Sequence, residues 1–194
     1  MRSILAQEKN PALREKAREI PLSDIKSART RKLVADMKKL LAAEEYGVAL
    51  AAPQVGEALR LFVVSGKALL RQAQDKSPNH PATEYQQSDE TPPPAQGGSA
   101  LGRDQVYINP VMTKVSRAKS DKHEGCLSIR GKWGEVARAE KATVQAYDEH
   151  GRTFMRGASG FLAHIFQHEM DHLEGILYTD KATHVYEEHE EKSR

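Results

Sequence analysis

Cysteine and long apolar runs are scarce in this sequence of 194 residues. A single cysteine cannot form a disulfide within the chain, which fits a reducing compartment. No run of about 18 apolar residues is present, so we expect no membrane-spanning helix. The first residues turn charged at Glu8 and Lys9, and we therefore expect no signal peptide. The net charge of +2 is too small to indicate a nucleic-acid site.

Apolar residues are also somewhat few, at 39% of the chain, which suggests that one segment lies outside the core. Residues 66–104 are rich in Gln, Ser, Pro and Gly and have no periodicity. We predict a polar surface insertion there. The length suits one domain, which we place at residues 1–178, followed by a charged, solvated tail at 179–194.

Hydrophobic periodicity and turn residues predict an order of helix, strands and helix. This order indicates an α+β fold, with antiparallel or mixed sheets around a central C-terminal helix. Ser23 is the expected N-cap of the long first helix, and Ser159 that of the last. The predicted helices cover residues 10–18, 23–46 and 159–175, and the predicted strands cover residues 59–64, 105–108, 111–117, 135–147 and 152–156.

The last predicted helix carries an H-E-x-x-H pattern at His168, Glu169 and His172. Side chains four residues apart lie one helical turn apart, so both imidazoles can bind one metal ion. Glu169 is placed to move protons for a water that the metal activates. The apolar neighbours Ile165 and Phe166 indicate a buried helix, where unpaired imidazoles are costly. The alternative is a pair of solvated histidines.

Cys126, in the stretch Glu124-Gly125-Cys126-Leu127-Ser128, is the candidate third ligand. Three protein ligands leave a tetrahedral metal one open position, as in catalytic sites. A lone cysteine can equally be a small buried hydrophobe. His164 extends the histidine stripe, but two turns span about 12 Å, too far for one metal to bind all three imidazoles. We therefore expect His164 to line the pocket wall.

A third stretch, Gly47-Val48-Ala49-Leu50-Ala51-Ala52-Pro53-Gln54, follows the long predicted helix. Small residues allow another backbone to approach closely. The Gln54 amide can donate a hydrogen bond to a developing oxyanion. Read alone, the stretch is also compatible with an ordinary Gly/Ala-rich connection.

Together the three stretches resemble the peptide deformylase family, which carries G-x-G-L-A-A-x-Q, E-G-C-L-S and Q-H-E-x-D-H-L in this order. The second and third motifs match throughout, and the first departs only at Ala49. Weaker likeness runs from Asn10 to about Tyr178, outside the insertion. The resemblance implies a cytoplasmic, bacterial-type enzyme that removes the formyl group from N-terminal formyl-methionine. Its partners would be nascent chains at the ribosome exit, with neither a specific nucleic-acid site nor a membrane.

The resemblance also implies the site residues and the cofactor. One divalent metal ion is expected, ferrous iron first, with zinc, nickel or cobalt also able to bind. General chemistry adds two expectations. Backbone groups of Val48 and Leu50 align the peptide as an added strand, and Glu124 pairs with Arg138 to brace the metal loop, the alternative being an ordinary surface charge. The implied roles are metal binding by Cys126, His168 and His172; proton transfer by Glu169; oxyanion binding by Gln54 and the Leu127 backbone N–H; and substrate binding by Gly47, Val48, Ala49, Leu50 and His164.

Three features depart from the usual family pattern: Ala49 in place of glycine, Arg130 in place of proline, and the long insertion. A related N-deacylase and a weakly active metal-binding or ribosome-docking homologue are the alternatives. A zincin-type metallopeptidase shares H-E-x-x-H, but zincins generally find their third ligand downstream, whereas Cys126 lies upstream.

Overall fold

The computed structural model describes residues 2–69 and 102–187, so most of the predicted insertion lies outside the described residues. Helices and short 3₁₀ turns alternate with strands. The helices are α1 (Ala28–Ala43), α3 (Gly160–Leu173) and α4 (Tyr178–Lys181), and the 3₁₀ turns are η1 (Gln7–Lys9), η2 (Pro11–Arg14), η3 (Leu22–Asp24) and η4 (Ala52–Val55). The strands are β1 (Ala49–Ala51), β2 (Leu61–Val64), β3 (Gln105–Val115), β4 (Lys119–Cys126), β5 (Ile129–Ala139), β6 (Lys141–Tyr147), β7 (Thr153–Ser159) and β8 (His184–Glu187).

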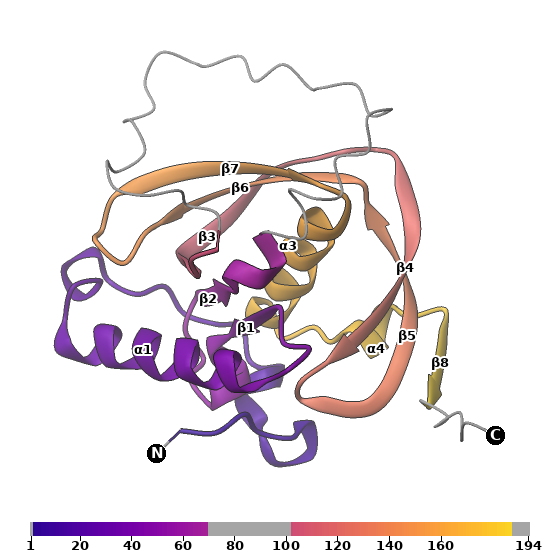
Figure 1. Cartoon of the computed structure of the whole chain (residues 1–194), viewed down its shortest axis with the longest axis horizontal. Helices are drawn as coiled ribbons and strands as arrows, with labels where there is room; N and C mark the ends of the chain where they lie inside the picture. Colours follow the sequence, from indigo (N-terminus) through magenta and orange to yellow (C-terminus); the bar gives the residue numbers. More distant parts are fainter. Residues whose placement is uncertain (1, 70–101, 188–194) are drawn as a thin grey trace.

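The strands form two sheets around α3. One sheet has five strands in the order β1-β2-β3-β6-β7, and the other has three in the order β4-β5-β8. Neighbouring strands are antiparallel in both sheets. Figure 1 shows α3 at the centre, between the two sheets. The predicted α+β class with a central C-terminal helix is confirmed.

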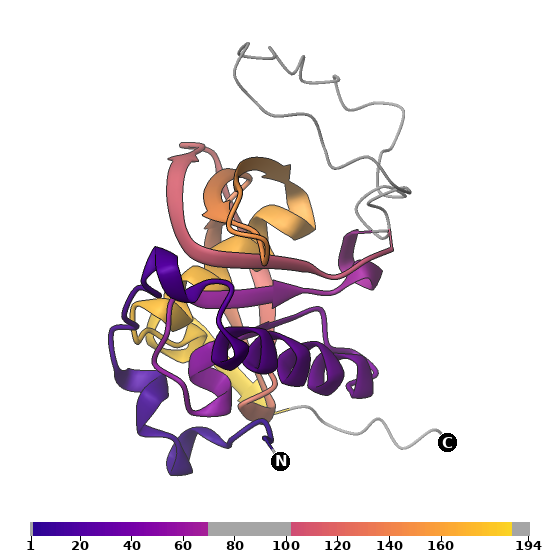
Figure 2. The ribbon, with the colours of Figure 1, turned by 90° about the vertical axis from the view of Figure 1, so that its left-hand side faces the viewer.

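Strand β2 explains why α3 is buried. Successive side chains of a strand point to opposite faces. Phe62 and Val64 pack in the cluster that contains the apolar side of α3, while Leu61 and Val63 pack in the cluster of α1. Figure 2 shows α1 running alongside this part of the sheet. The strand is therefore apolar at every position, as its sequence predicted.

The two N-terminal helix predictions need correction. Helix α1 begins at Ala28, because the Oγ of Ser27 accepts the backbone N–H of Thr30 at 3.1 Å and caps the helix there. Ser23 lies in the preceding turn η3. The predicted helix over residues 10–18 is only the turn η2, because the backbone of Arg18 instead bonds to the segment before β2.

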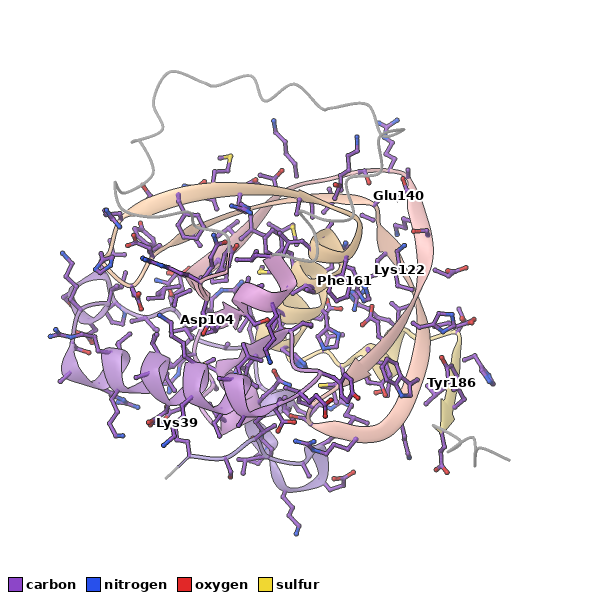
Figure 3. The ribbon with its side chains drawn as sticks, in the orientation of Figure 1. Lys39, Asp104, Lys122, Glu140, Phe161 and Tyr186 are labelled. Atoms are coloured by element: carbon purple, nitrogen blue, oxygen red, sulfur yellow. The ribbon has the colours of Figure 1, made fainter. Side chains whose placement is uncertain are left out.

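The strand boundaries also differ from the prediction. The two strands predicted at 105–108 and 111–117 are one strand, β3, with a register shift between Ile108 and Val111. Asn109 has a φ of 48° there, and Pro110 lacks an N–H, which gave the appearance of a break. The segment 135–147 is divided at Glu140, where β5 turns into β6 (Figure 3).

Residues 184–187 lie in the predicted charged tail and keep mostly exposed side chains, but their backbone is part of the fold. They form β8, which pairs with β5 from Lys132 to Glu135. The Tyr178 hydroxyl donates to the Lys132 carbonyl at 2.9 Å, and Figure 3 shows Tyr186 on β8 beside β5. The edge of β5 would otherwise present unpaired N–H and C=O groups, and β8 pairs with them. Residues 188–194 lie outside the described part of the chain.

Candidate metal centre

Helix α3 and the end of β4 bring the predicted ligands together. The rings of His168 and His172 lie one turn apart on α3, with centroids 4.8 Å apart. Cys126, the last residue of β4, lies beside them, with its Sγ 3.3 Å from His172 Nε2. The ligand atoms of the three residues all lie within 4.8 Å of one another. The trio inferred from sequence is thus one cluster.

This cluster fits a divalent metal ion by its chemistry. A thiolate and two imidazoles suit iron, zinc and related metals. Among the described residues, the buried Glu169 Oε2 has no hydrogen-bond partner. Buried carboxyl oxygens normally have one, supplied by protein, water or an ion. The oxygen is therefore available to a water molecule held in the site.

The carboxylate of Glu124 organises one side of the centre. Its side chain is 1% exposed, and Arg138 donates to both oxygens, at 2.6 and 3.0 Å. Its Oε2 also lies 2.7 Å from His168 Nδ1. Such a contact fixes the ring and leaves Nε2 for a metal. The predicted pair of Glu124 and Arg138 is confirmed, and Asp171, which sequence reasoning did not single out, binds Arg138 at 2.6 Å.

His164 also contacts this carboxylate. Its Nε2 lies 2.9 Å from Glu124 Oε1, and the residue is 7% exposed. The four-residue spacing of His164 and His168 places both on one helix face, which was the available signal for a shared partner. The substrate-pocket role predicted for His164 stays a prediction.

Burial and hydrogen bonding give Glu124 and Glu169 very different pKa values. Burial opposes ionisation of Glu124, but hydrogen bonds from His164, His168 and Arg138 outweigh it and hold its pKa well below the usual range. Glu169 has no such donors among the residues that the structure describes, and burial raises its pKa to about 7. A carboxyl group with a pKa near neutrality can both accept and return a proton.

Gln54 and Leu127 flank the cysteine, as the motifs predicted. The Gln54 Oε1 accepts the Ala51 N–H at 2.8 Å, which directs Nε2 toward Cys126 Sγ at 3.4 Å. Leu127 follows Cys126 in the turn between β4 and β5. The Gln54 amide thus contacts the cysteine, and the oxyanion role of the Leu127 backbone N–H stays a prediction.

Strand β1 is an edge strand, and its backbone alternates in direction. The Val48 carbonyl accepts the Ser65 N–H at 2.9 Å, so Val48 and, two residues on, Leu50 face β2. The role of the backbone of these two residues in peptide binding stays a prediction. Ala49 and Ala51 face the free edge, and Gln54 already binds the Ala51 N–H.

Ala49 stands where the family motif has glycine, but its backbone does not require one. Asn109 is the only non-glycine residue with positive φ in the described part of the chain. Alanine at position 49 is thus free of backbone strain, and it is 6% exposed.

Comparison with known proteins decides the family. The sequence profile described as polypeptide deformylase matches residues 1–188. The chain belongs to the polypeptide deformylase family. It is similar to a peptide deformylase of Symbiobacterium thermophilum, 41% identical over 185 residues that cover 94% of this chain and 69% of that protein. It is also 32% identical over 192 residues to a peptide deformylase of Desulforudis audaxviator, covering 96% and 97% of the two chains.

Solved structures of the family share the fold. The plant peptide deformylase PDF1B superposes with a TM-score of 0.69 at 31% identity, covering 94% of this chain and 80% of that chain. A peptide deformylase of Legionella pneumophila gives 0.69 at 29% identity, covering 94% and 86%. The chain is therefore an enzyme, a metal-dependent hydrolase that removes the N-formyl group of polypeptides.

Proposed function

We propose that Cys126, His168 and His172 hold a single metal ion and that Glu169 transfers the protons of deformylation. The observation that carries this proposal is the ligand trio, within 4.8 Å, together with the buried Glu169 oxygen for which the described part of the chain offers no hydrogen-bond partner. When bound, the metal supplies a Lewis acid that activates water and polarises the formyl group.

Residues of the chain itself then transfer the proton, bind the oxyanion and bind the peptide. The Glu169 carboxylate takes a proton from the attacking water and returns it to the leaving amine nitrogen, for which a pKa near 7 is well matched. Gln54 Nε2 and the Leu127 N–H donate to the oxygen of the former formyl group as negative charge develops on it. The backbone of Ala49, at the free edge of β1, binds the peptide as an added strand.

The proposed resident metal is ferrous iron, with zinc, nickel or cobalt as metals that the same ligands accept. The proposed substrates are formyl-methionyl nascent chains at the ribosome exit, in a bacterial-type cytoplasm. Bacterial relatives support this setting. Within residues 2–69 and 102–187, no helix is long and apolar enough to cross a membrane. We assign the activity to one catalytic domain, residues 1–178. Strand β8 lies beyond these bounds and pairs with β5 of the domain.

The decisive assay compares formyl-Met-Ala-Ser with its acetylated and unblocked forms, using protein loaded anaerobically with ferrous iron. We expect turnover of the formyl peptide, with one metal ion per chain. Comparable turnover of the acetyl peptide would identify a broader N-deacylase. Metal binding without turnover would identify a weakly active homologue.

A further inference from the structure

Two segments face each other at the metal centre and are joined at two points. One segment runs from Glu44, the C-cap of α1, through β1 to Gln54, and the other runs from Cys126, the last residue of β4, to Arg130 in β5. At the metal end, Gln54 Nε2 lies 3.4 Å from Cys126 Sγ. At the other end, Arg130 Nη2 donates to Glu44 Oε1 at 2.6 Å, joining residues 86 positions apart in the sequence. The ion pair therefore marks the end of β1 that lies away from the metal.

The direction of a bound peptide follows if Gln54 binds the oxyanion, so this inference rests on the function proposed above. The formyl end then lies beside Gln54, at the C-terminal end of β1. The rest of the peptide must run back along the free edge, antiparallel to β1, toward Gly47 and Glu44. At about 3.3 Å per residue, the third and fourth residues of the substrate reach the ion pair.

The chemistry of the ion pair shows what this position can bind. Arg130 already holds a carboxylate there. Its side chain is 64% exposed, and that of Glu44 is 24% exposed, so a substrate can reach both groups. Exposed ion pairs contribute little to stability, and a carboxylate from a substrate can therefore replace Glu44 at little cost. A guanidinium has five N–H donors, so it can also bind two carboxylates together.

We propose that Arg130 is a specificity-determining residue that favours acidic side chains at the third and fourth positions of the formyl peptide. Glu44 is the internal competitor, which occupies Arg130 when no acidic substrate is bound. The contact between Arg130 and the acidic side chain lies far from the reacting bond, so it stabilises the bound substrate and the transition state equally. It should therefore lower KM and leave kcat unchanged.

The test measures kcat/KM for formyl-Met-Ala-Xaa-Xaa-amide, in which both Xaa are Glu, Gln or Lys. Amidation removes the terminal carboxylate, which would otherwise bind Arg130 itself. For the native enzyme we expect Glu to exceed Lys by about threefold to tenfold, decreasing with added salt. Arg130→Gln should bring the Glu/Lys ratio close to one, and Glu44→Gln should raise it above the native value.

Lys132→Gln is the matched control, because it removes one positive charge from an exposed residue of the same strand. It should keep the native ratio. An equal loss of preference in this variant would show a general charge effect and overturn the inference, as would an unchanged ratio in Arg130→Gln. Turnover of formyl-Met-Ala-amide by the native enzyme distinguishes a failure of the proposed function from a failure of the role of Arg130. If that peptide is not hydrolysed, the proposed function fails as well; if it is, only the role of Arg130 is in question.

Discussion

At the scale of single residues, neighbouring glutamates show how surroundings decide chemistry. Glu124 receives hydrogen bonds from His164, His168 and Arg138 and remains ionised. Glu169, on the same helix as two of these donors, is buried with one oxygen unpartnered among the described residues. The first glutamate holds a ligand in place, and the second is able to exchange a proton.

Glu169→Gln should separate proton transfer from metal binding. Glutamine keeps the shape of the side chain but cannot accept and return the proton. We expect full metal content and a loss of about two to four orders of magnitude in kcat. Metal analysis and steady-state kinetics on the same sample measure both. Turnover close to that of the native enzyme would show that another group moves the proton.

The same substitution should change stability with pH in the metal-free protein. The pKa of Glu169 is about 7 when folded, against 4.5 ordinarily, so the folded state binds more protons than the unfolded state between these values. The contribution of Glu169 to the stability of the native chain therefore falls as pH rises through this window and stays level above about pH 7. Glu169→Gln should be more stable by about 1 to 3 kcal/mol at pH 8. Urea unfolding should show this advantage shrink toward zero near pH 4.5.

Cys126→Ala should remove the third metal ligand. Two imidazoles alone bind metal more weakly, so we expect a severe loss of metal content and of activity together. Cys126→Ser tests whether an oxygen ligand restores part of the binding. A full equivalent of metal in the alanine variant would show that Cys126 is not a ligand.

At the scale of elements, Arg138 connects the parts that carry the ligands. It extends from β5, binds Glu124 on β4 at 2.6 Å and Asp171 on α3 at 2.6 Å, and its side chain is 4% exposed. The hairpin that positions Cys126 is thereby joined to the helix that carries both histidines. This connection holds the thiol and the imidazoles at a fixed separation.

Arg138→Leu should destabilise the fold more than the loss of a surface ion pair. It leaves Glu124 buried without its cation, and such losses cost about 3 to 5 kcal/mol. Arg152→Leu is the control, because it breaks an exposed pair with Asp148 whose loss should cost under about 1 kcal/mol. Chemical denaturation measures both. Equal costs would mean that Arg138 does not brace the centre.

At the scale of the whole molecule, the described residues on the two sides of residues 70–101 lie together. The Gly66 N–H donates to Asp104 Oδ1 at 3.0 Å. Neighbouring strands β2 and β3 pair directly from Leu61 to Val64 on one side of it. The described residues that flank 70–101 are therefore held together by their own contacts.

Replacing residues 70–101 with a short Gly/Ser linker should keep the fold. Loop length changes closure entropy only slowly, so we expect the free energy of unfolding to stay within about 1 kcal/mol. Deformylation of a formyl tripeptide should also persist. Loss of cooperative unfolding in the linker variant would show that the replaced segment contributes to the core.

The sequence alone determined the local chemistry of this protein. The spacing of His168 and His172 sets one helix face, because helical periodicity is a local property. The apolar run of β2 was likewise readable. The motifs around Gln54 and Cys126 were also readable, and they led to the correct family.

The tertiary structure decided contacts that no sequence pattern predicted. Cys126 lies 46 positions before His172, and the family motifs, not a local period, indicated that contact. Arg130 lies 86 positions after Glu44, and no motif or period in the sequence predicted their ion pair. Three further features also arise from contacts between distant segments. They are the pairing of β8 with β5, the direction of the β1 backbone and the burial that raises the pKa of Glu169. Each depends on chain segments packed from elsewhere, and packing between distant segments is set by the whole core rather than by neighbours along the chain.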